Sequence, residues 1–234
     1  MDTQGLPEEI VAVGEALKRF LSAEVVPLET ANARLLASQR SVYDEIGRFA
    51  PEVLALRAEV RRKSAEAGFY TMFGPEALGG EGLGPVATAY LNAVLSEAAG
   101  PGRVLVHPVV IPSPFTNGLS PVLIHLDPSL HGRYLPGLAS GATTSAFALS
   151  EPDAGSDVFA MTSRAVRDGD DWVLTGTKQW ITNGPYADHV MVFAVTDPEK
   201  AAARKGGITG FLVNADQPGF EVVAPIPTMG ELGA

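Results

Sequence analysis

Two stretches of the sequence combine residue types that suit the binding of a flat ligand with polar edges. In the first, an apolar run ends at Leu149 and gives way to a turn of small and polar residues at 150–157. Such a turn can direct several backbone N–H groups and hydroxyls at one anionic or carbonyl-rich ligand. The second stretch, residues 178–184, places the indole of Trp180 near the hydroxyl of Thr182. We interpret the two stretches together as a cofactor site.

The segments around these stretches have the two-residue period of β-strands. Strands are predicted at residues 145–149, 190–195, 210–213 and 220–223. The Asp-Gly turn within residues 167–170 predicts a hairpin between residues 160–166 and 172–175. Because the period changes near residue 143, we expect a β domain from residue 143 to residue 234, containing both stretches.

The residues before this point have the period of helices. Apolar side chains recur at three- and four-residue spacing from Ile10 to Val25, and we expect Pro27 to end that helix. Further helices are predicted at residues 38–49, 51–67, 85–95, 121–126 and 128–138. The glycine cluster at residues 79–84 is interpreted as a connection between helices, since it lacks the strand–turn–helix frame of a nucleotide loop.

Helices first and strands second predict an α+β protein. We expect an N-terminal helical-bundle domain at residues 1–142 and an incomplete β-barrel-like middle domain at residues 143–234. No internal repeat interrupts this division.

The charge of the chain limits its partners. The formal net charge is −10, from 14 acidic and 9 basic residues up to residue 100 and 13 and 8 after it, so each part carries −5. This even acidity argues against a nucleic-acid partner, which needs a basic surface. A polyphosphate ligand would have to be held by backbone N–H groups, hydroxyls or a few cations.

Several other kinds of site and location are disfavoured. Cysteine is absent, which excludes disulfides, thiolate metal sites and a cysteine nucleophile. The histidines show no ligand spacing, and Ser150 lies outside a Gly-x-Ser-x-Gly elbow, so we expect neither a metal site nor a serine hydrolase. No apolar run spans a membrane, and residues 1–9 do not resemble a signal peptide, so we expect a cytoplasmic protein.

Residues 147–157, with residues 178–184 behind them, resemble the acyl-CoA dehydrogenase family, a group of FAD enzymes. Further resemblances follow in family order at residues 67–69, 75–80, 133–141, 163–184 and 228–230. The resemblance implies FAD as cofactor and the α,β-dehydrogenation of an acyl-CoA thioester to the trans-2-enoyl thioester. It also implies electron-transfer flavoprotein or O2 as the electron acceptor, and assembly into a homo- or hetero-oligomer.

The resemblance also implies which residues hold the flavin ring. Ser150 and the backbone around Leu149 match the donors to the N1 and C2-carbonyl edge, where negative charge develops on reduction. Thr182 matches the group near N5 and O4, and Trp180 matches the aromatic residue packed on the ring. The cofactor-binding residues are Phe147, Leu149, Ser150, Gly155, Ser156, Trp180, Ile181 and Thr182.

In the turn, Gly155 and Ser156 match the residues near the pyrophosphate, and Ser156 also matches a contact to the pantetheine arm of the substrate. Asp153 stands where the family often has glycine, which places a charge beside the expected phosphates. We expect Asp157 to brace the turn through its side chain. Glu151 is interpreted as part of the turn and not as a general base.

The family's C-terminal helical domain carries the glutamate that removes the α proton, and residues 1–234 show no resemblance to it. We therefore nominate no catalytic residue and expect the base to come from further sequence or from a second chain. Two alternatives stay open. One is a non-catalytic partner subunit that binds flavin or acyl thioester, and the other is an acyl-CoA oxidase.

Overall fold

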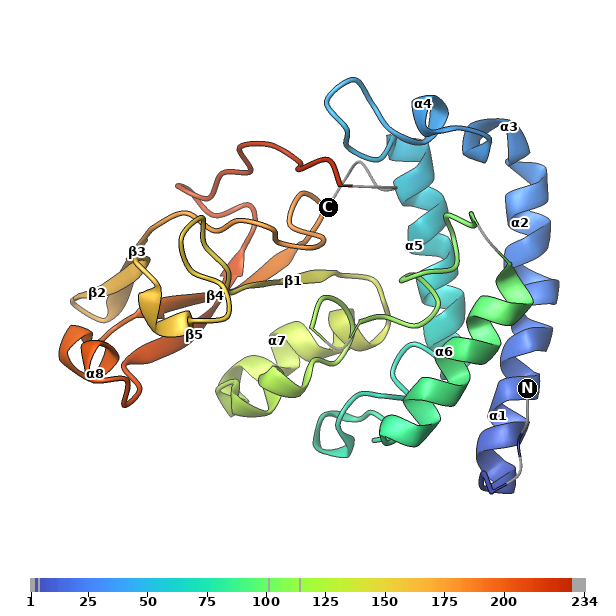
Figure 1. Cartoon of the computed structure of the whole chain (residues 1–234), viewed down its shortest axis with the longest axis horizontal. Helices are drawn as coiled ribbons and strands as arrows, with labels where there is room; N and C mark the ends of the chain where they lie inside the picture. The colour runs from blue at the N-terminus through green and yellow to red at the C-terminus, as the bar shows by residue number, and fades with distance from the viewer. Residues whose placement is uncertain (1–2, 4, 101, 114, 229–234) are drawn as a thin grey trace. The chain divides into compact units, whose positions relative to one another are not determined.

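The computed structural model describes residues 3, 5–100, 102–113 and 115–228. Contacts divide the chain into two compact units. We call Met1–Glu45 with Phe49–Thr143 the helical unit, and Ile46–Arg48 with Thr144–Ala234 the sheet unit. All the described strands and two short helices belong to the sheet unit, and the remaining helices belong to the helical unit (Figure 1). The predicted α+β class, with helices first and strands second, is confirmed.

The helical unit is built on long helices joined by short helical turns. Its elements are α1 Glu8–Phe20, η1 Leu21–Val25, α2 Val26–Ala31, α3 Ala33–Leu36, α4 Gln39–Val42, α5 Pro51–Glu66, η2 Glu76–Leu78, α6 Pro85–Ala99, η3 Pro121–His125 and α7 Pro128–Ala139. Helices α1 and α6 lie side by side (Figure 1). They approach closely at Gly14, where a Cβ atom would lie 2.9 Å from the ring of Tyr90. A larger residue at position 14 would therefore force the Tyr90 ring to shift.

Pro27 does not end the first helical segment, so that prediction is wrong. The wide π-helical turn η1 follows α1, and Pro27 then occupies the first turn of α2. At this position a missing backbone N–H costs little, because N–H groups of a first turn have no partner within their helix. The wide turn thus lets the chain continue helically past the proline.

The helix predicted at residues 38–49 is also wrong for most of its length. Only α4 forms, and the chain then makes a turn through Gly47, whose φ is +85°. Tyr43 pairs with Phe49 as an isolated antiparallel bridge, and their rings stack with centroids 4.8 Å apart. A glycine with positive φ ends a helix readily, and the aromatic stack stabilises the turn instead.

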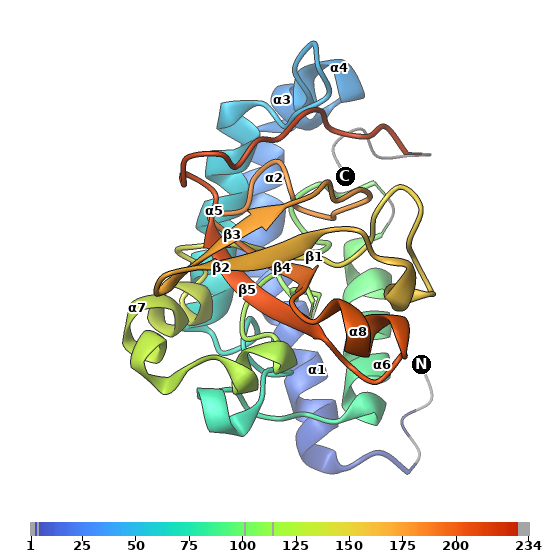
Figure 2. The ribbon, with the colours of Figure 1, turned by 90° about the vertical axis from the view of Figure 1, so that its left-hand side faces the viewer.

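The sheet unit is a mixed sheet centred on β4. Its elements are β1 Ser145–Ala148, η4 Val158–Ala160, β2 Arg164–Asp168, β3 Asp171–Thr175, β4 His189–Val195, α8 Pro198–Ala202 and β5 Ile208–Asn214. Strand β4 pairs in parallel with β1 and in antiparallel with β5, and β2 joins it in parallel through Arg164 and Val195. Strands β2 and β3 form the predicted hairpin around Gly169 (Figure 2). The strand predicted at residues 220–223 is absent from the described sheet, because alternation alone supplies no partner strand.

Small side chains make up the core of the sheet unit next to β1. Ala146 and Ala148 of β1 are buried with Ala187 and Val190, and Ile181 packs against this cluster. Ile181 therefore anchors residues 178–184 against β1, the strand that leads into residues 150–157. Residues 229 and 230, part of the last family resemblance, lie outside the described residues.

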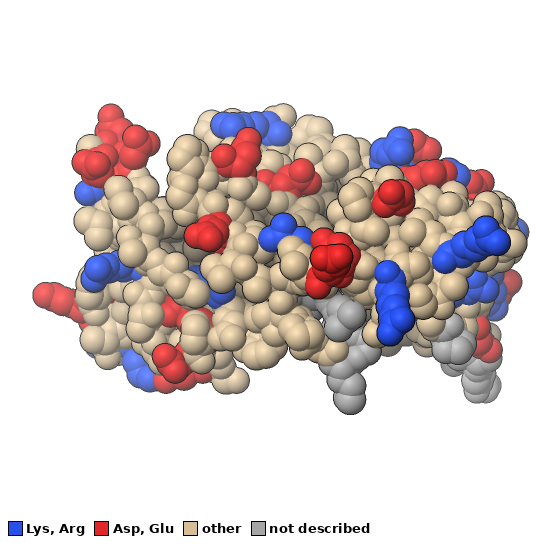
Figure 3. Space-filling model, turned by 90° about the horizontal axis from the view of Figure 1, so that it is seen from above, with Lys and Arg blue, Asp and Glu red and all other residues tan. Residues whose placement is uncertain are grey.

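The surface carries charges of both signs. The face in Figure 3 shows separate Lys and Arg side chains among Asp and Glu side chains, with no continuous basic area on that face. This agrees with the even acidity of the sequence. Among the described residues, no helix combines the length and the apolar character needed to cross a membrane.

Candidate cofactor site

The two stretches singled out in the sequence lie side by side in the sheet unit. Where β1 ends, the carbonyl of Ser150 accepts a hydrogen bond from the backbone N–H of Gln179, at 3.0 Å. The ammonium group of Lys178 donates to the carbonyl of Leu149, at 3.1 Å. Thr182 follows Gln179 by three residues, a reach of at most about 11 Å along the chain. Ser150 and Thr182 therefore belong to one region of the molecular surface.

Residues 180–182 are presented to the solvent. Trp180 is 58% exposed, and its backbone φ of +63° lies in the left-handed region that a bulky residue rarely adopts. Thr182 is also exposed, whereas Ile181 between them is half-buried against the core. The loop thus points an indole and a hydroxyl outward around a single apolar anchor.

The remaining ring-binding candidates line the end of β1. Phe147 lies in β1, half-buried, with its ring 4.8 Å from that of Phe193 in β4. Leu149 and Ser150 are half-buried directly after the strand. The structure therefore brings Phe147, Leu149 and Ser150 close to residues 178–182, and their role in cofactor binding stays a prediction.

The turn after Ser150 is tied at its base and open at its tip. Glu151 and Ala154 exchange two backbone hydrogen bonds, of 2.7 and 3.3 Å. Gly155 and Ser156 at the tip are exposed, and a Cβ atom built on Gly155 would meet no heavy atom within 4 Å. This open space suits the approach of a ligand to the backbone N–H groups.

Asp157 closes the turn, as expected from the sequence. Its side chain accepts a hydrogen bond from the backbone N–H of Phe159, at 3.2 Å, and caps the short helix η4. It also forms an ion pair of 2.6 Å with Arg204, which lies after α8. Hydrogen bonding to Arg204 lowers the pKa of the Asp157 carboxyl. Part of the negative charge of the turn is thereby offset.

Glu151 is buried and fully engaged by donors. Its carboxylate accepts hydrogen bonds from the ammonium group of Lys178 (2.8 Å), from the N–H and hydroxyl of Thr162 (2.7 and 2.8 Å) and from the N–H of Ser163 (3.1 Å). Burial by itself raises the pKa of this carboxyl, but these donors outweigh it and lower the pKa to about 2. Such a carboxylate is a poor proton acceptor near neutral pH. The geometry favours a structural role for Glu151.

Sequence reasoning assigned no role to Lys178 or Arg204. Lys178 links Leu149 to Glu151, and Arg204 contacts Asp157 in a bidentate arrangement. For Lys178 the sequence gives no signal, because its partner Glu151 is 27 residues away. For Arg204 we find none, because its partner is 47 residues away in the sequence.

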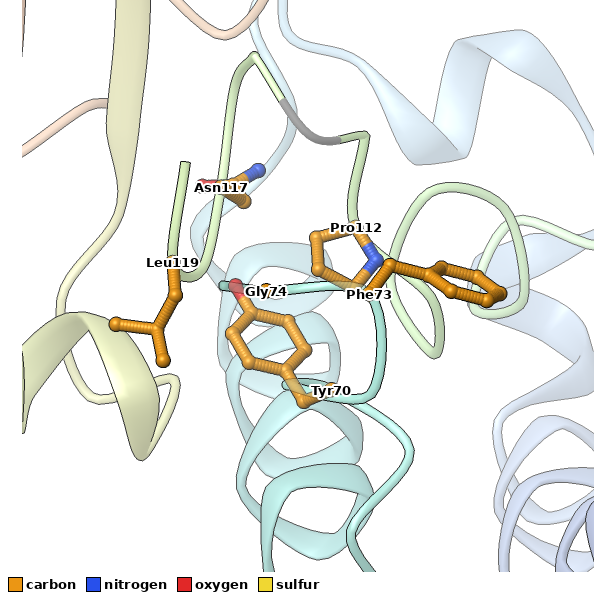
Figure 4. A pocket seen from close by; sticks show the side chains of 6 residues that line it. All are labelled: Tyr70, Phe73, Gly74, Pro112, Asn117 and Leu119. Atoms are coloured by element: carbon orange, nitrogen blue, oxygen red, sulfur yellow. The ribbon is translucent and has the colours of Figure 1, made fainter. Parts of the chain in front are cut away.

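The helical unit contains a small cavity of its own, lined by Tyr70, Phe73, Gly74, Pro112, Asn117 and Leu119 (Figure 4). The ring of Tyr70 directs its hydroxyl into this cavity. Tyr70 is 2% exposed, and its hydroxyl has no hydrogen-bond partner among the described residues. Burial raises the pKa of the phenol to about 12, so Tyr70 stays neutral. The space suits about one water molecule and is too small for a cofactor.

Comparison with known proteins gives one consistent family. The sequence model "Acyl-CoA dehydrogenase, middle domain" matches residues 146–234. "Probable acyl-CoA dehydrogenase FadE25" of Mycobacterium tuberculosis is 35% identical over 218 residues, which are 93% of this chain and 49% of that protein. The chain thus spans about half the length of the curated relatives it matches.

Solved structures give the same result. A glutaryl-CoA dehydrogenase from Mycobacterium smegmatis in complex with FADH2 has a TM-score of 0.62 and 27% identity, covering 92% of this chain and 47% of that one. The structure described as "Tcur3481-Tcur3483 steroid ACAD" has a TM-score of 0.69 and 27% identity, covering 99% of this chain and 53% of that one.

Proposed function

Because the chain belongs to the acyl-CoA dehydrogenase family, we propose that it forms the helical and β-sheet parts of an FAD-dependent enzyme. The proposed reaction removes a proton from the α-carbon and a hydride from the β-carbon of an acyl-CoA thioester, leaving the trans-2-enoyl thioester. The observation that carries the proposal is the hydrogen bond between Gln179 and Ser150, which joins the two predicted ring-binding segments in one surface region.

The donor chemistry of this region suits a flavin. Thr182 and Ser156 are exposed and Ser150 is half-buried, so their hydroxyls are placed where a ligand could reach them. Trp180 adds an exposed aromatic face on which a planar ring can stack. Bound FAD would supply the acceptor for the hydride that leaves the β-carbon of the acyl chain.

The chain's own residues would bind and orient the cofactor. Ser150 and the backbone of Leu149 would donate to one polar edge of the ring, and Thr182 to the other. Preorganised donors of this kind stabilise negative charge that develops during the reaction. Ile181 and Phe147 would hold these groups in place through the sheet core.

The turn would bind phosphate without a basic surface. Gly155 and Ser156 would offer backbone N–H groups and a hydroxyl to the pyrophosphate, and Ser156 would also contact the thioester substrate. The ion pair of Asp157 with Arg204 supports this assignment, because it offsets one negative charge of the turn. Asp153, exposed in the same turn, works against it.

We propose that the base for the α proton lies outside the candidate site. Glu151, the buried carboxylate at the site, stays ionised. Burial raises its pKa, but its hydrogen-bond donors outweigh burial and lower the pKa to about 2. Electron-transfer flavoprotein or O2 would reoxidise the flavin, and the enzyme would act as a homo- or hetero-oligomer. The acyl group is not assigned, and a cytoplasmic location stays a prediction.

The test uses the protein expressed from its full reading frame. It should purify with FAD and show bleaching of the flavin absorbance when an acyl-CoA is added without oxygen. Thr182→Ala should slow this reduction about tenfold, which corresponds to about 1.4 kcal/mol of lost transition-state stabilisation. Thr175→Ala, at an exposed threonine of β3, is the matched control and should leave the rate unchanged. Failure to bind FAD would refute the proposed function, and an unchanged rate in Thr182→Ala would refute the role of Thr182.

A further inference from the structure

The loop of residues 180–182 is fastened on both sides to β1 and its continuation. On the N-terminal side, Gln179 donates its backbone N–H to Ser150. On the C-terminal side, the side-chain amide of Asn183 donates to the backbone carbonyl of Ser145, at 2.9 Å. Ser145 is fully buried at the start of β1. The two attachments therefore lie at the start of β1 and just beyond its end.

Asn183 also fixes the backbone that follows the loop. Its carbonyl accepts hydrogen bonds from the N–H groups of Tyr186 and Ala187, both at 3.0 Å. Its φ of +66° lies in the left-handed region, which asparagine tolerates better than most residues. One residue thus supplies both a backbone turn and a side-chain attachment to the sheet.

Trp180 needs such support. A bulky residue in the left-handed region has a strain of about 1–3 kcal/mol, and it persists only where the surrounding structure fixes it. The indole itself is 58% exposed, so packing holds only part of it. The attachments on either side of the loop are well placed to fix the backbone that orients it.

We propose that Asn183 is a positioning residue. Through its bond to Ser145 and its left-handed backbone, it holds Trp180 and Thr182 in the orientation that binds the ligand of this site. That the ligand is a flavin rests on the proposed function, but the positioning of Trp180 does not.

The experiment follows the mobility of Trp180 by fluorescence anisotropy in the full chain. The chain has two tryptophans, so Trp172→Phe leaves Trp180 as the single reporter. Asn183→Gly keeps the left-handed backbone accessible but removes the amide, and Asn183→Asp keeps the size but removes the donor. Asn92→Ala is the control, because Asn92 also donates its side-chain amide to a backbone carbonyl, at 2.9 Å, but does so within α6.

We expect the fluorescence anisotropy of Trp180 to be lower in both Asn183 variants. We also expect the dissociation constant for FAD to rise about tenfold, because the site loses about one hydrogen bond that preforms it. Anisotropy equal to that of Asn92→Ala would overturn the inference. If Asn183→Gly fails to fold, Asn183→Asp decides by the same comparison. If the parent chain binds no FAD, the proposed function fails, while the anisotropy still tests the role of Asn183.

Discussion

The Nζ atom of Lys178 lies 2.8 Å from Oε1 of Glu151, and this ion pair joins the two segments of the candidate site. Their side chains are 11% and 2% exposed. The remaining oxygen of Glu151 accepts bonds from Thr162, and Lys178 also donates to Leu149. A buried pair is stable only when its other hydrogen-bonding groups are satisfied in this way.

Removing the cation should therefore be costly. We expect Lys178→Met to lower the free energy of unfolding by about 3–5 kcal/mol, because Glu151 would be left buried without a counter-charge. Urea unfolding measures the change. Lys200→Met is the control, since the Lys200–Asp197 pair is exposed and such pairs contribute little to stability. Equal losses in the two variants would contradict the structural role assigned to the buried pair.

The same pair should make stability depend on pH in the acid range. The ordinary pKa of the Glu151 carboxyl is 4.5, and in the folded chain it is about 2. Burial raises the pKa, but the hydrogen-bond donors lower it by more. Because the folded-state pKa is the lower one, Glu151 contributes stability above pH 4.5 and loses it as the pH falls toward 2. The contribution is on the order of 3 kcal/mol.

Comparison with Glu151→Gln isolates this contribution from the other carboxyls. The difference in unfolding free energy between the parent chain and the variant should be constant above about pH 5 and should shrink as the pH falls. A difference that stays constant down to pH 2 would show that Glu151 does not have a lowered pKa.

Much of the fold could be predicted where local sequence and tertiary packing agree. The helix α5 begins at Pro51 and β4 coincides with a continuous apolar run, and both were predicted to within a residue or two. The segment at residues 38–49 could not be predicted, because the contact of Tyr43 with Phe49 outweighs its helical periodicity. Pro27 was misinterpreted because a π-helical turn has no signal that periodicity detects.

The candidate site could be located from the sequence but its internal support could not. The family resemblance selected residues 147–157 and 178–184, which the structure brings together. Lys178 and Glu151 are 27 residues apart, and Arg204 and Asp157 are 47 apart. Pairings at such separations depend on how the strands are arranged, which the residue types alone do not fix.

The ion pair between Arg204 and Asp157 gives a prediction for cofactor affinity. Both side chains are exposed, so Arg204→Ala should leave the free energy of unfolding almost unchanged. It should nevertheless weaken FAD binding several-fold, on the order of 1 kcal/mol, because the turn of Gly155 and Ser156 loses its tether and a nearby positive charge. FAD titration measures the effect.

Arg167→Ala is the matched control for this variant. Arg167 and Arg204 each lie over an aromatic ring, 5.3 Å from its centroid, but Arg167 lies over Trp172 and donates to the carbonyl of Gly169, both in the β2–β3 hairpin. If both variants bind FAD like the parent chain, the proposed phosphate-binding role of the turn loses its support.

Tyr70 allows a test of the helical unit that is independent of the cofactor. Its hydroxyl is buried without a partner among the described residues, and such a group carries a desolvation cost of about 1–3 kcal/mol. Tyr70→Phe removes the hydroxyl and keeps the ring, so the unfolding free energy should stay unchanged or rise by about 1 kcal/mol. Ser64→Ala is the matched comparison, because the equally buried hydroxyl of Ser64 donates to the carbonyl of Val110 at 2.6 Å. That variant should lose about 1 kcal/mol or more. If Tyr70→Phe is destabilised as much as Ser64→Ala, the Tyr70 hydroxyl must be bonded in solution, for which a water molecule in the cavity is the simplest partner.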